Sequence, residues 1–159
     1  MIIGITGKSG SGKTTLAKKY IEKGYIHVPI DEIGHEVILE NKYILEGWFG
    51  TSDRKELGEL VFNNRHKYED FSNAIWKQME KKIDRILEEN ENVILDFILL
   101  PHTKYWKDCY KVLVKCPDYI RKQRVLERDN ISEEYYNLRE QHSIEYNEQE
   151  MNEIINGEF

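Results

Sequence analysis

The sequence predicts an α/β protein with a mostly parallel sheet, and the alternation of its elements is the main reason. Short apolar runs with β-branched residues alternate with longer segments whose apolar residues recur at steps of three and four. The strand candidates are apolar on both faces, which is typical of a sheet that helices cover on both sides. We therefore expect a single domain over residues 1–159 with helices on both faces of its sheet.

The first elements flank a glycine-rich segment. The run "MIIGIT" predicts a buried strand over residues 1–6, and residues 13–23 predict a helix that Gly24 ends. The expected apolar face of this helix contains Leu16, Ala17, Tyr20 and Ile21. The run "YIHVPI" predicts a second strand over residues 25–30. Pro29 belongs near a strand end or on an edge, because proline cannot donate a ladder hydrogen bond.

Helices are expected to follow the second strand. Asp31 opens a short helix, and Asp53 with Glu56 has the spacing of a capping box ahead of another helix. Residues 65–89 predict a long helix. The apolar stripe of this long helix, which we expect to pack in the core, consists of Tyr68, Phe71, Ile75, Met79, Ile83 and Ile86 or Leu87.

The rest of the chain continues the alternation. The run "NVILDFILL" predicts a central strand over residues 92–100. The run "YKVLVKCP" predicts another strand, after which Pro117 is well placed to start a helix. Ser132 has the position of a cap for a helix that runs towards Gln149.

The composition of the chain indicates which kind of molecule the protein binds. The net charge of −6 argues against a protein whose main role is to bind nucleic acid. No apolar run reaches the roughly 18 residues of a membrane span, and "MIIGIT" is too short for a signal peptide. Cys109 and Cys116 are too few for a zinc site or a disulfide framework, so we expect both to be reduced. We expect a cytoplasmic protein whose partner is a small molecule, and the sequence predicts no oligomeric state.

A phosphate-binding loop is predicted between the first strand and the first helix. The segment "GKSGSGKTT" contains Gly7-x-x-x-x-Gly12-Lys13-Thr14, the spacing of a P-loop. Glycines let the backbone surround phosphate oxygens with N–H groups, and the following helix adds its positive end. Lys13 is expected to reach the β- and γ-phosphates of ATP, and the Thr14 hydroxyl to ligate Mg²⁺. The expected nucleotide-binding residues of the loop are Gly7, Lys8, Ser9, Gly10, Ser11, Gly12, Lys13, Thr14 and Thr15.

The loop alone does not decide the reaction. The chain has no Asn-Lys-x-Asp to read guanine and is too short for a large ATPase, which leaves a small-molecule kinase with an acceptor site, a base and a lid bearing arginines. Arg124 and Arg128 are four residues apart, so they lie on one helical face and suit such a lid. The alternative for these arginines is a solvated face paired with neighbouring acids.

Two acids follow strands and have two interpretations each. Asp31 is either the base that takes a proton from the acceptor or the cap of its helix. Asp96 ends a buried strand, where many P-loop proteins hold an acid that orients Mg²⁺ or its water. Asp96 could instead cap the next segment or be a strand-end acid with no further role.

Several stretches, in a characteristic order, resemble the dephospho-CoA kinase family, P-loop enzymes that phosphorylate the ribose 3′-hydroxyl of dephospho-CoA to give coenzyme A. These stretches are "IIGITGKSGSGKTT", "IDEIGHEV", "DRKELGELVF", "VILDFILLP", "QRVLERDNISEE" and "EIINGEF". The resemblance implies a three-layer α/β/α P-loop NTPase fold of the nucleoside-monophosphate-kinase type. It also implies a helical acceptor-binding region over about 32–90 and a lid region over about 118–149.

The resemblance further implies which residues act. Lys13, Asp31 and Arg128 would be catalytic, with Asp31 at the position of the family's catalytic aspartate. Arg124 and Arg128 match lid positions that bind the nucleotide, and Thr14 with Asp96 would hold Mg²⁺. The implied cofactors are therefore ATP and Mg²⁺, and the implied partner is dephospho-CoA or another nucleotide-like acceptor.

The chain also departs from the family pattern, mostly on the acceptor side. Pro29 stands where the family has an additional Asp, His35 stands near a family Arg, and Ile75-Trp76 replaces a His-Pro pair. The family's last helix is absent after "EIINGEF". The alternatives are therefore a kinase for another nucleotide or nucleoside, or a non-catalytic nucleotide-binding module. Retention of Lys13, Asp31 and the lid arginines argues against the module.

Overall fold

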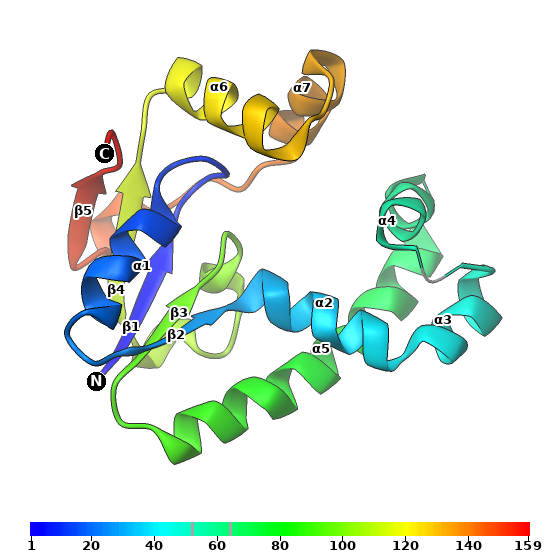
Figure 1. Ribbon diagram of the computed structural model, residues 1–159, viewed down its shortest axis with the longest axis horizontal. Helices are drawn as coiled ribbons and strands as arrows, with labels where there is room; N and C mark the ends of the chain where they lie inside the picture. The colour runs from blue at the N-terminus through cyan, green and yellow to red at the C-terminus, as the bar shows by residue number, and fades with distance from the viewer. Residues whose placement is uncertain (52, 64) are drawn as a thin grey trace. The chain divides into compact units, whose positions relative to one another are not determined.

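The described residues form one five-stranded sheet with the strand order β2-β3-β1-β4-β5 (Figure 1). The strands are β1 (Ile2–Thr6), β2 (Ile26–Pro29), β3 (Val93–Asp96), β4 (Tyr110–Lys115) and β5 (Glu153–Asn156). Strand β1 pairs in parallel with β3 and β4, and β4 pairs in parallel with β5. The predicted α/β class with a mostly parallel sheet is confirmed. Pro29 ends an edge strand, as its missing N–H requires.

This computed structural model describes residues 1–51, 53–63 and 65–159, and the side chains of residues 48, 49, 54, 61–68 and 71 are outside the description. The chain forms two compact units. The first unit, Met1–Val28 with Glu91–Phe159, holds the sheet with α1 (Lys13–Ile21), α6 (Asp118–Asp129) and α7 (Glu133–Gln141). The second unit, Pro29–Asn90, holds α2 (Ile30–Glu40), α3 (Lys42–Phe49), α4 (Arg54–Asn63) and α5 (Arg65–Glu89). None of the described helices is both long enough and apolar enough to cross a bilayer.

The core of the first unit forms where α1 packs on the sheet. Its buried residues are Ile3, Ile5, Leu16, Ala17, Ile94, Val112 and Val114. The prediction that Ile21 joins this face is wrong, because Ile21 is the last residue of α1 and is 44% exposed. The helix ends through Gly24, whose φ of 92° is left-handed and whose N–H donates to the Ile21 carbonyl.

Strand β3 is shorter than predicted. It ends at Asp96, and the chain then turns into the 3₁₀ helices η1 (Leu100–His102) and η2 (Trp106–Asp108). The Thr6 hydroxyl lies 2.9 Å from the carbonyl oxygens of both Phe97 and Ile98. This side-chain contact turns those carbonyls away from a sheet ladder, so the apolar run "FILL" does not continue the strand.

Helices α6 and α7 begin as predicted, but α7 ends earlier. Pro117 is the N-cap of α6, and the Ser132 hydroxyl accepts the Tyr135 N–H at 3.1 Å at the start of α7. The predicted extension of this helix to Gln149 is wrong, because α7 ends at Gln141. The chain instead returns to the sheet, and a short 3₁₀ helix, η3 (Glu148–Glu150), precedes β5.

The secondary structure described after Pro29 in the second unit consists of helices α2 to α5, and the longest, α5, has the bounds that the periodicity predicts. Ile75, Met79 and Ile83 are buried as expected, whereas the side chains of Tyr68 and Phe71 lie outside the described residues. Helix α3 was not predicted, because its eight residues contain too few turns to establish a periodic pattern.

The start of α4 uses the predicted spacing in a modified way. The Glu56 N–H donates to the Asp53 carboxylate at 3.0 Å, which is half of a capping box. The Glu56 carboxylate does not return to Asp53 but accepts the Thr51 hydroxyl at 2.5 Å. The Thr51 oxygen in turn accepts the Asp53 N–H at 3.1 Å, so Thr51 completes the box.

Candidate active site

The phosphate loop lies between β1 and α1, in the place that its spacing predicts. Gly10 and Gly12 have φ values of 78° and 107°, which side chains rarely tolerate. A Cβ at Gly12 would also lie 2.9 Å from the Gly157 carbonyl oxygen. The Lys13 amino group donates to the carbonyls of Gly7 and Lys8, at 2.9 and 3.3 Å. The loop lysine therefore lies across its own loop, close to backbone carbonyls of the segment that is expected to bind phosphate.

The start of α1 is open to an anion. No acidic residue occurs in its first turn, and Thr14 and Thr15 are exposed. The first N–H groups of a helix have no carbonyl partner within the helix, and the helix dipole makes this end positive. The backbone therefore favours phosphate binding here before any side chain contributes.

Helix α6 presents three arginines to the loop. Arg121 donates to the Ser9 carbonyl at 3.2 Å, and Arg124 donates to the Gly10 carbonyl at 3.1 Å. Arg128 donates to the Ser9 hydroxyl at 3.1 Å. Steps of three and four place all three on one helical face, so the predicted common face of Arg124 and Arg128 is confirmed. Sequence reasoning missed Arg121, although the same i, i+3 spacing could have indicated it.

The two predicted lid arginines differ in how their charge is balanced. Arg124 also donates to the Gly157 carbonyl at 2.8 Å, and no carboxylate among the described residues pairs with it. Arg128 forms two bonds with Asp129, at 2.7 and 3.1 Å, while its side chain stays 58% exposed. The hydrogen bond from Arg128 lowers the pKa of Asp129, and Arg139 at 3.4 Å lowers it further. The alternative interpretation is that these arginines are solvated and paired with neighbouring acids. Arg128 fits it in part, because it is exposed and paired with Asp129, whereas Arg124 does not fit it.

Asp96 lies at the carboxyl end of β3, beside β1. It is 7% exposed, and its carboxylate oxygen lies 3.0 Å from Nε2 of His27 on β2. Its register partner is Ile5, two residues before the loop begins. The partnership with His27 joins residues 69 positions apart, which no local pattern could indicate.

Asp31 lies in the first turn of α2, which begins at Ile30. The N-cap of this helix is Pro29, which offers no side-chain cap. The cap interpretation of Asp31 is therefore wrong, although Asp31 and Glu32 both favour the positive end of the helix. The Asp31 side chain is exposed, in the second unit.

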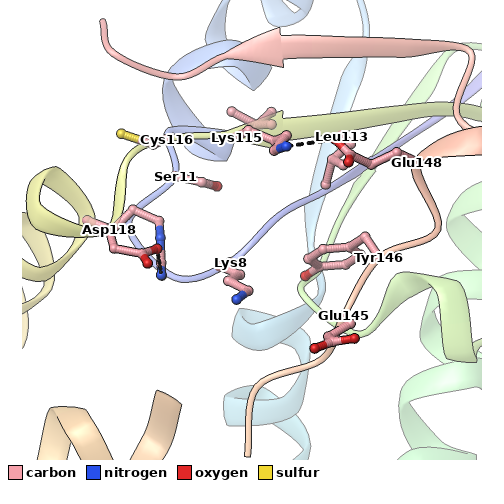
Figure 2. Close-up of a pocket in the computed structure, with 11 residues that line it drawn as sticks. Lys8, Ser11, Leu113, Lys115, Cys116, Asp118, Glu145, Tyr146 and Glu148 are labelled. Atoms are coloured by element: carbon pink, nitrogen blue, oxygen red, sulfur yellow. Dashed lines mark hydrogen bonds and ion pairs between the residues drawn. The ribbon is translucent and has the colours of Figure 1, made fainter. Parts of the chain in front are cut away.

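A cavity of about 310 Å³ adjoins the loop within the first unit, and Figure 2 shows the side chains around it. Lys8 and Ser11 line it from the loop, Cys116 from the end of β4, and Tyr146 from the segment that returns to the sheet. The Tyr146 hydroxyl donates to the Ile98 carbonyl at 2.8 Å, and burial raises its pKa. The Ser11 hydroxyl is buried without a hydrogen-bond partner in the described structure. Polar side chains such as Lys8 and Tyr146 therefore line the cavity, together with the buried hydroxyl of Ser11.

The oxygen donors present fit Mg²⁺. Among the described residues there is no cluster of three acidic, histidine or cysteine side chains that could hold a metal. Mg²⁺ does not need one, because it is usually bound through one or two protein oxygens together with substrate phosphates and water. The exposed hydroxyl of Thr14 and the carboxylate of Asp96 are donors of the preferred kind.

The parallel strand, the loop and the following helix together define a P-loop nucleotide-binding protein. The dephospho-CoA kinase family model matches residues 1–156, and the chain belongs to this family. A dephospho-CoA kinase of Fusobacterium nucleatum is 36% identical, over 84% of this chain and 76% of that protein.

Solved structures agree on the fold. A crystal structure of a protein from Thermus thermophilus matches with a TM-score of 0.85 and 25% identity, over 97% of this chain and 86% of that chain. A dephospho-CoA kinase from Campylobacter jejuni matches with a TM-score of 0.60 and 21% identity, over 96% and 86% of the two chains. The predicted fold and family are confirmed.

Replacing Arg128 with Ala should lower kcat at least about tenfold and leave the melting temperature nearly unchanged. The reason is that an exposed ion pair such as Arg128–Asp129 contributes little stability, whereas the predicted role of Arg128 is to contact the transferring phosphates. Steady-state kinetics and thermal melting measure the two effects.

The matched control for this prediction is Lys122→Ala, which removes another α6 cation that pairs with a lid acid, Glu133. It should change neither quantity. An Arg128→Ala protein that melts much earlier yet turns over normally when folded would assign Arg128 to structure.

Proposed function

We propose that this protein transfers the γ-phosphoryl group of ATP to the ribose 3′-hydroxyl of dephospho-CoA, giving coenzyme A. The observation that carries the proposal is the extent of the family match, residues 1–156, which covers the loop, Asp31 and the lid helices. Two free cysteines fit a reducing compartment such as the cytoplasm.

The ATP side of the reaction is assigned to the first unit. The backbone of loop residues Gly7–Thr15 surrounds the phosphates, and Lys13 exchanges its two carbonyl contacts for phosphate oxygens. Arg124 and Arg128 add positive charge from the lid as negative charge spreads over the transferring group. Arg124 is well suited to this task, because its known partners are carbonyls that leave its charge unbalanced.

The metal site is assigned to Thr14 and Asp96. Mg²⁺, when bound with ATP, would neutralise charge on the phosphates. The Thr14 hydroxyl would be a direct ligand, and Asp96 would orient the ion or its water. His27 holds one oxygen of Asp96, which leaves the orientation of this carboxylate restricted.

Asp31 is assigned as the base. It lies two positions after Pro29, the last residue of β2, and ligands of parallel α/β sheets bind beyond the carboxyl ends of the strands. Its carboxylate would accept the proton of the acceptor hydroxyl as the phosphoryl group arrives, a step that contributes about a hundred- to ten-thousand-fold.

The proposal is tested by adding ATP and Mg²⁺ with each member of an acceptor panel, namely dephospho-CoA, nucleosides and nucleoside monophosphates. ADP release should occur with dephospho-CoA, and the product should carry phosphate at the 3′ position by NMR. Lys13→Ala should abolish turnover with a smaller loss of ATP binding, which controls for a contaminating kinase. Transfer to a different acceptor would change the substrate, and ATP binding with no transfer at all would make the protein a non-catalytic module.

The Thr14 assignment predicts that Thr14→Val raises the Mg²⁺ concentration needed for half-maximal rate, by about tenfold or more, because Val has the shape of Thr without its oxygen. Thr14→Ser keeps the oxygen and should behave like the wild type. Calorimetry provides a second readout. The improvement in ATP affinity on adding Mg²⁺ should shrink in the Val variant, and an unchanged improvement would remove Thr14 from the metal site.

The Asp31 assignment predicts that Asp31→Asn keeps ATP affinity and folds within about 1 kcal/mol of the wild type, since a first-turn acid contributes only this much through the helix dipole. Its turnover should fall at least about a hundredfold. Glu32→Gln is the matched control, because Glu32 is an exposed acid in the same turn. Equal effects of the two variants on turnover would leave Asp31 with a helix-dipole role alone.

A further inference from the structure

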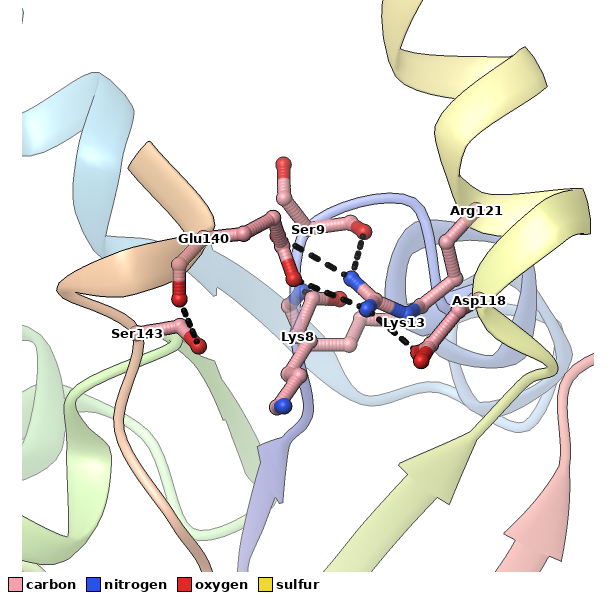
Figure 3. A network of polar contacts seen from close by, with 7 residues as sticks. All are labelled: Lys8, Ser9, Lys13, Asp118, Arg121, Glu140 and Ser143. Carbon is pink, nitrogen blue, oxygen red and sulfur yellow. Dashed lines mark hydrogen bonds and ion pairs between the residues drawn. The ribbon is translucent and has the colours of Figure 1, made fainter. Parts of the chain in front are cut away.

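Arg121 is the most deeply buried charged group of the first unit that the proposed mechanism does not use. It is 2% exposed, and its guanidinium forms a fork with the Glu140 carboxylate of α7, with bonds of 2.9 and 3.3 Å (Figure 3). It also donates to Asp118, one turn earlier on α6, at 2.8 Å. The guanidinium therefore joins the two lid helices.

The charge of Arg121 is fully balanced. Burial by itself lowers the pKa of Arg121, but the hydrogen bonds to Glu140 and Asp118 raise it by more. The hydrogen bond from Arg121 also lowers the pKa of Asp118. A buried network of this kind is often replaceable by apolar residues at no cost in stability. Stability alone therefore gives no reason for an arginine at this position.

A further contact reaches the phosphate loop. Arg121 donates to the Ser9 carbonyl at 3.2 Å, across 112 positions of sequence. In a trans peptide the C=O and the next N–H point in opposite directions, so this bond directs the Gly10 N–H away from α6. Gly10 has a φ of 78° and no side chain to restrict it, so an external contact has a large effect on its conformation.

We propose that Arg121 is a positioning residue for the nucleotide site. It fixes the peptide between Ser9 and Gly10, and through Glu140 it fastens α7 to the same point. The loop is thereby ordered before ATP arrives, and less of the binding energy is used to order it. The inference concerns ATP binding at the site proposed above and does not depend on which acceptor is phosphorylated.

A double substitution of Arg121 and Glu140 separates an effect on the phosphate loop from an effect on the stability of the protein. Arg121→Met alone leaves the Glu140 carboxylate without its partner and should lower the melting temperature. The double variant R121M/E140L replaces both members of the fork with apolar groups and should melt near the wild type. Asp118 needs no replacement, because its side chain is 91% exposed and water can solvate it.

We expect the double variant to bind ATP about tenfold more weakly by calorimetry, since the Ser9 carbonyl has lost a charged donor. The KM for ATP should rise while the KM for the acceptor stays unchanged. Amide exchange in loop residues 8–12 should quicken in the absence of nucleotide. Arg85→Met, which breaks an exposed ion pair with Glu89 on α5, is the control and should change none of these.

Restoration of both stability and ATP affinity in R121M/E140L would overturn the proposal and leave Arg121 with a structural role only. If the double variant fails to fold, Arg121→Lys tests the same point, because one ammonium cannot replace the planar fork and its additional contacts. Wild-type ATP affinity and loop exchange in Arg121→Lys would also overturn it. Failure of transfer to dephospho-CoA, with ATP binding intact, would reject the proposed acceptor and leave this test valid.

Discussion

The phosphate loop must present bare backbone to an anion, and much of the first unit follows from this constraint. Three glycines make the backbone of this loop flexible, and hydrogen bonds from Lys13 and from α6 restrict it. Lys13 bonds the carbonyl of Gly7, and arginines of α6 bond the loop at Ser9 and Gly10. The chain near the end of β5 also approaches so closely that a Cβ at Gly157 would meet the Ser11 carbonyl. The Lys13 and arginine bonds go to carbonyl oxygens of the loop, and the Ser11 N–H donates within the loop to the Lys8 carbonyl at 3.1 Å.

Arg121, Arg124 and Arg128 all contact the loop, but they differ in burial and in the groups that balance their charge. Arg121 is buried and neutralised by two carboxylates, so it can orient a peptide but offers no net charge to a ligand. Arg128 is exposed and pairs with Asp129, so its charge is partly balanced. Arg124 bonds carbonyls, which align its guanidinium without cancelling its charge. Of the three, Arg124 is the arginine whose charge no carboxylate among the described residues balances.

The second unit carries the part of the chain in which this protein departs most from its family pattern. Ile75, which stands in the place of a family histidine, is buried in α5, and the Trp76 indole donates to Glu80 at 2.5 Å. Both residues thus support the packing and local polar structure of their helix. The ATP side keeps its motif residues, whereas the departures at His35 and Ile75-Trp76 lie on helices between β2 and β3. This division explains why the nucleotide is easier to infer than the acceptor.

The sequence by itself determined the features that depend on neighbours along the chain. The glycine spacing predicted the loop, periodicity predicted the bounds of α5, and the hydroxyl of Ser132 predicted the start of α7. Only the tertiary structure showed where β3 and α7 end and that Asp31 is not the N-cap of α2. It also showed that Asp96 pairs with His27 and that Arg121 pairs with Glu140. The physical reason is distance along the chain. Local sequence patterns reflect helix and turn preferences. The contacts between His27 and Asp96, 69 positions apart, and between Arg121 and Ser9, 112 positions apart, form only after folding has brought the partners together.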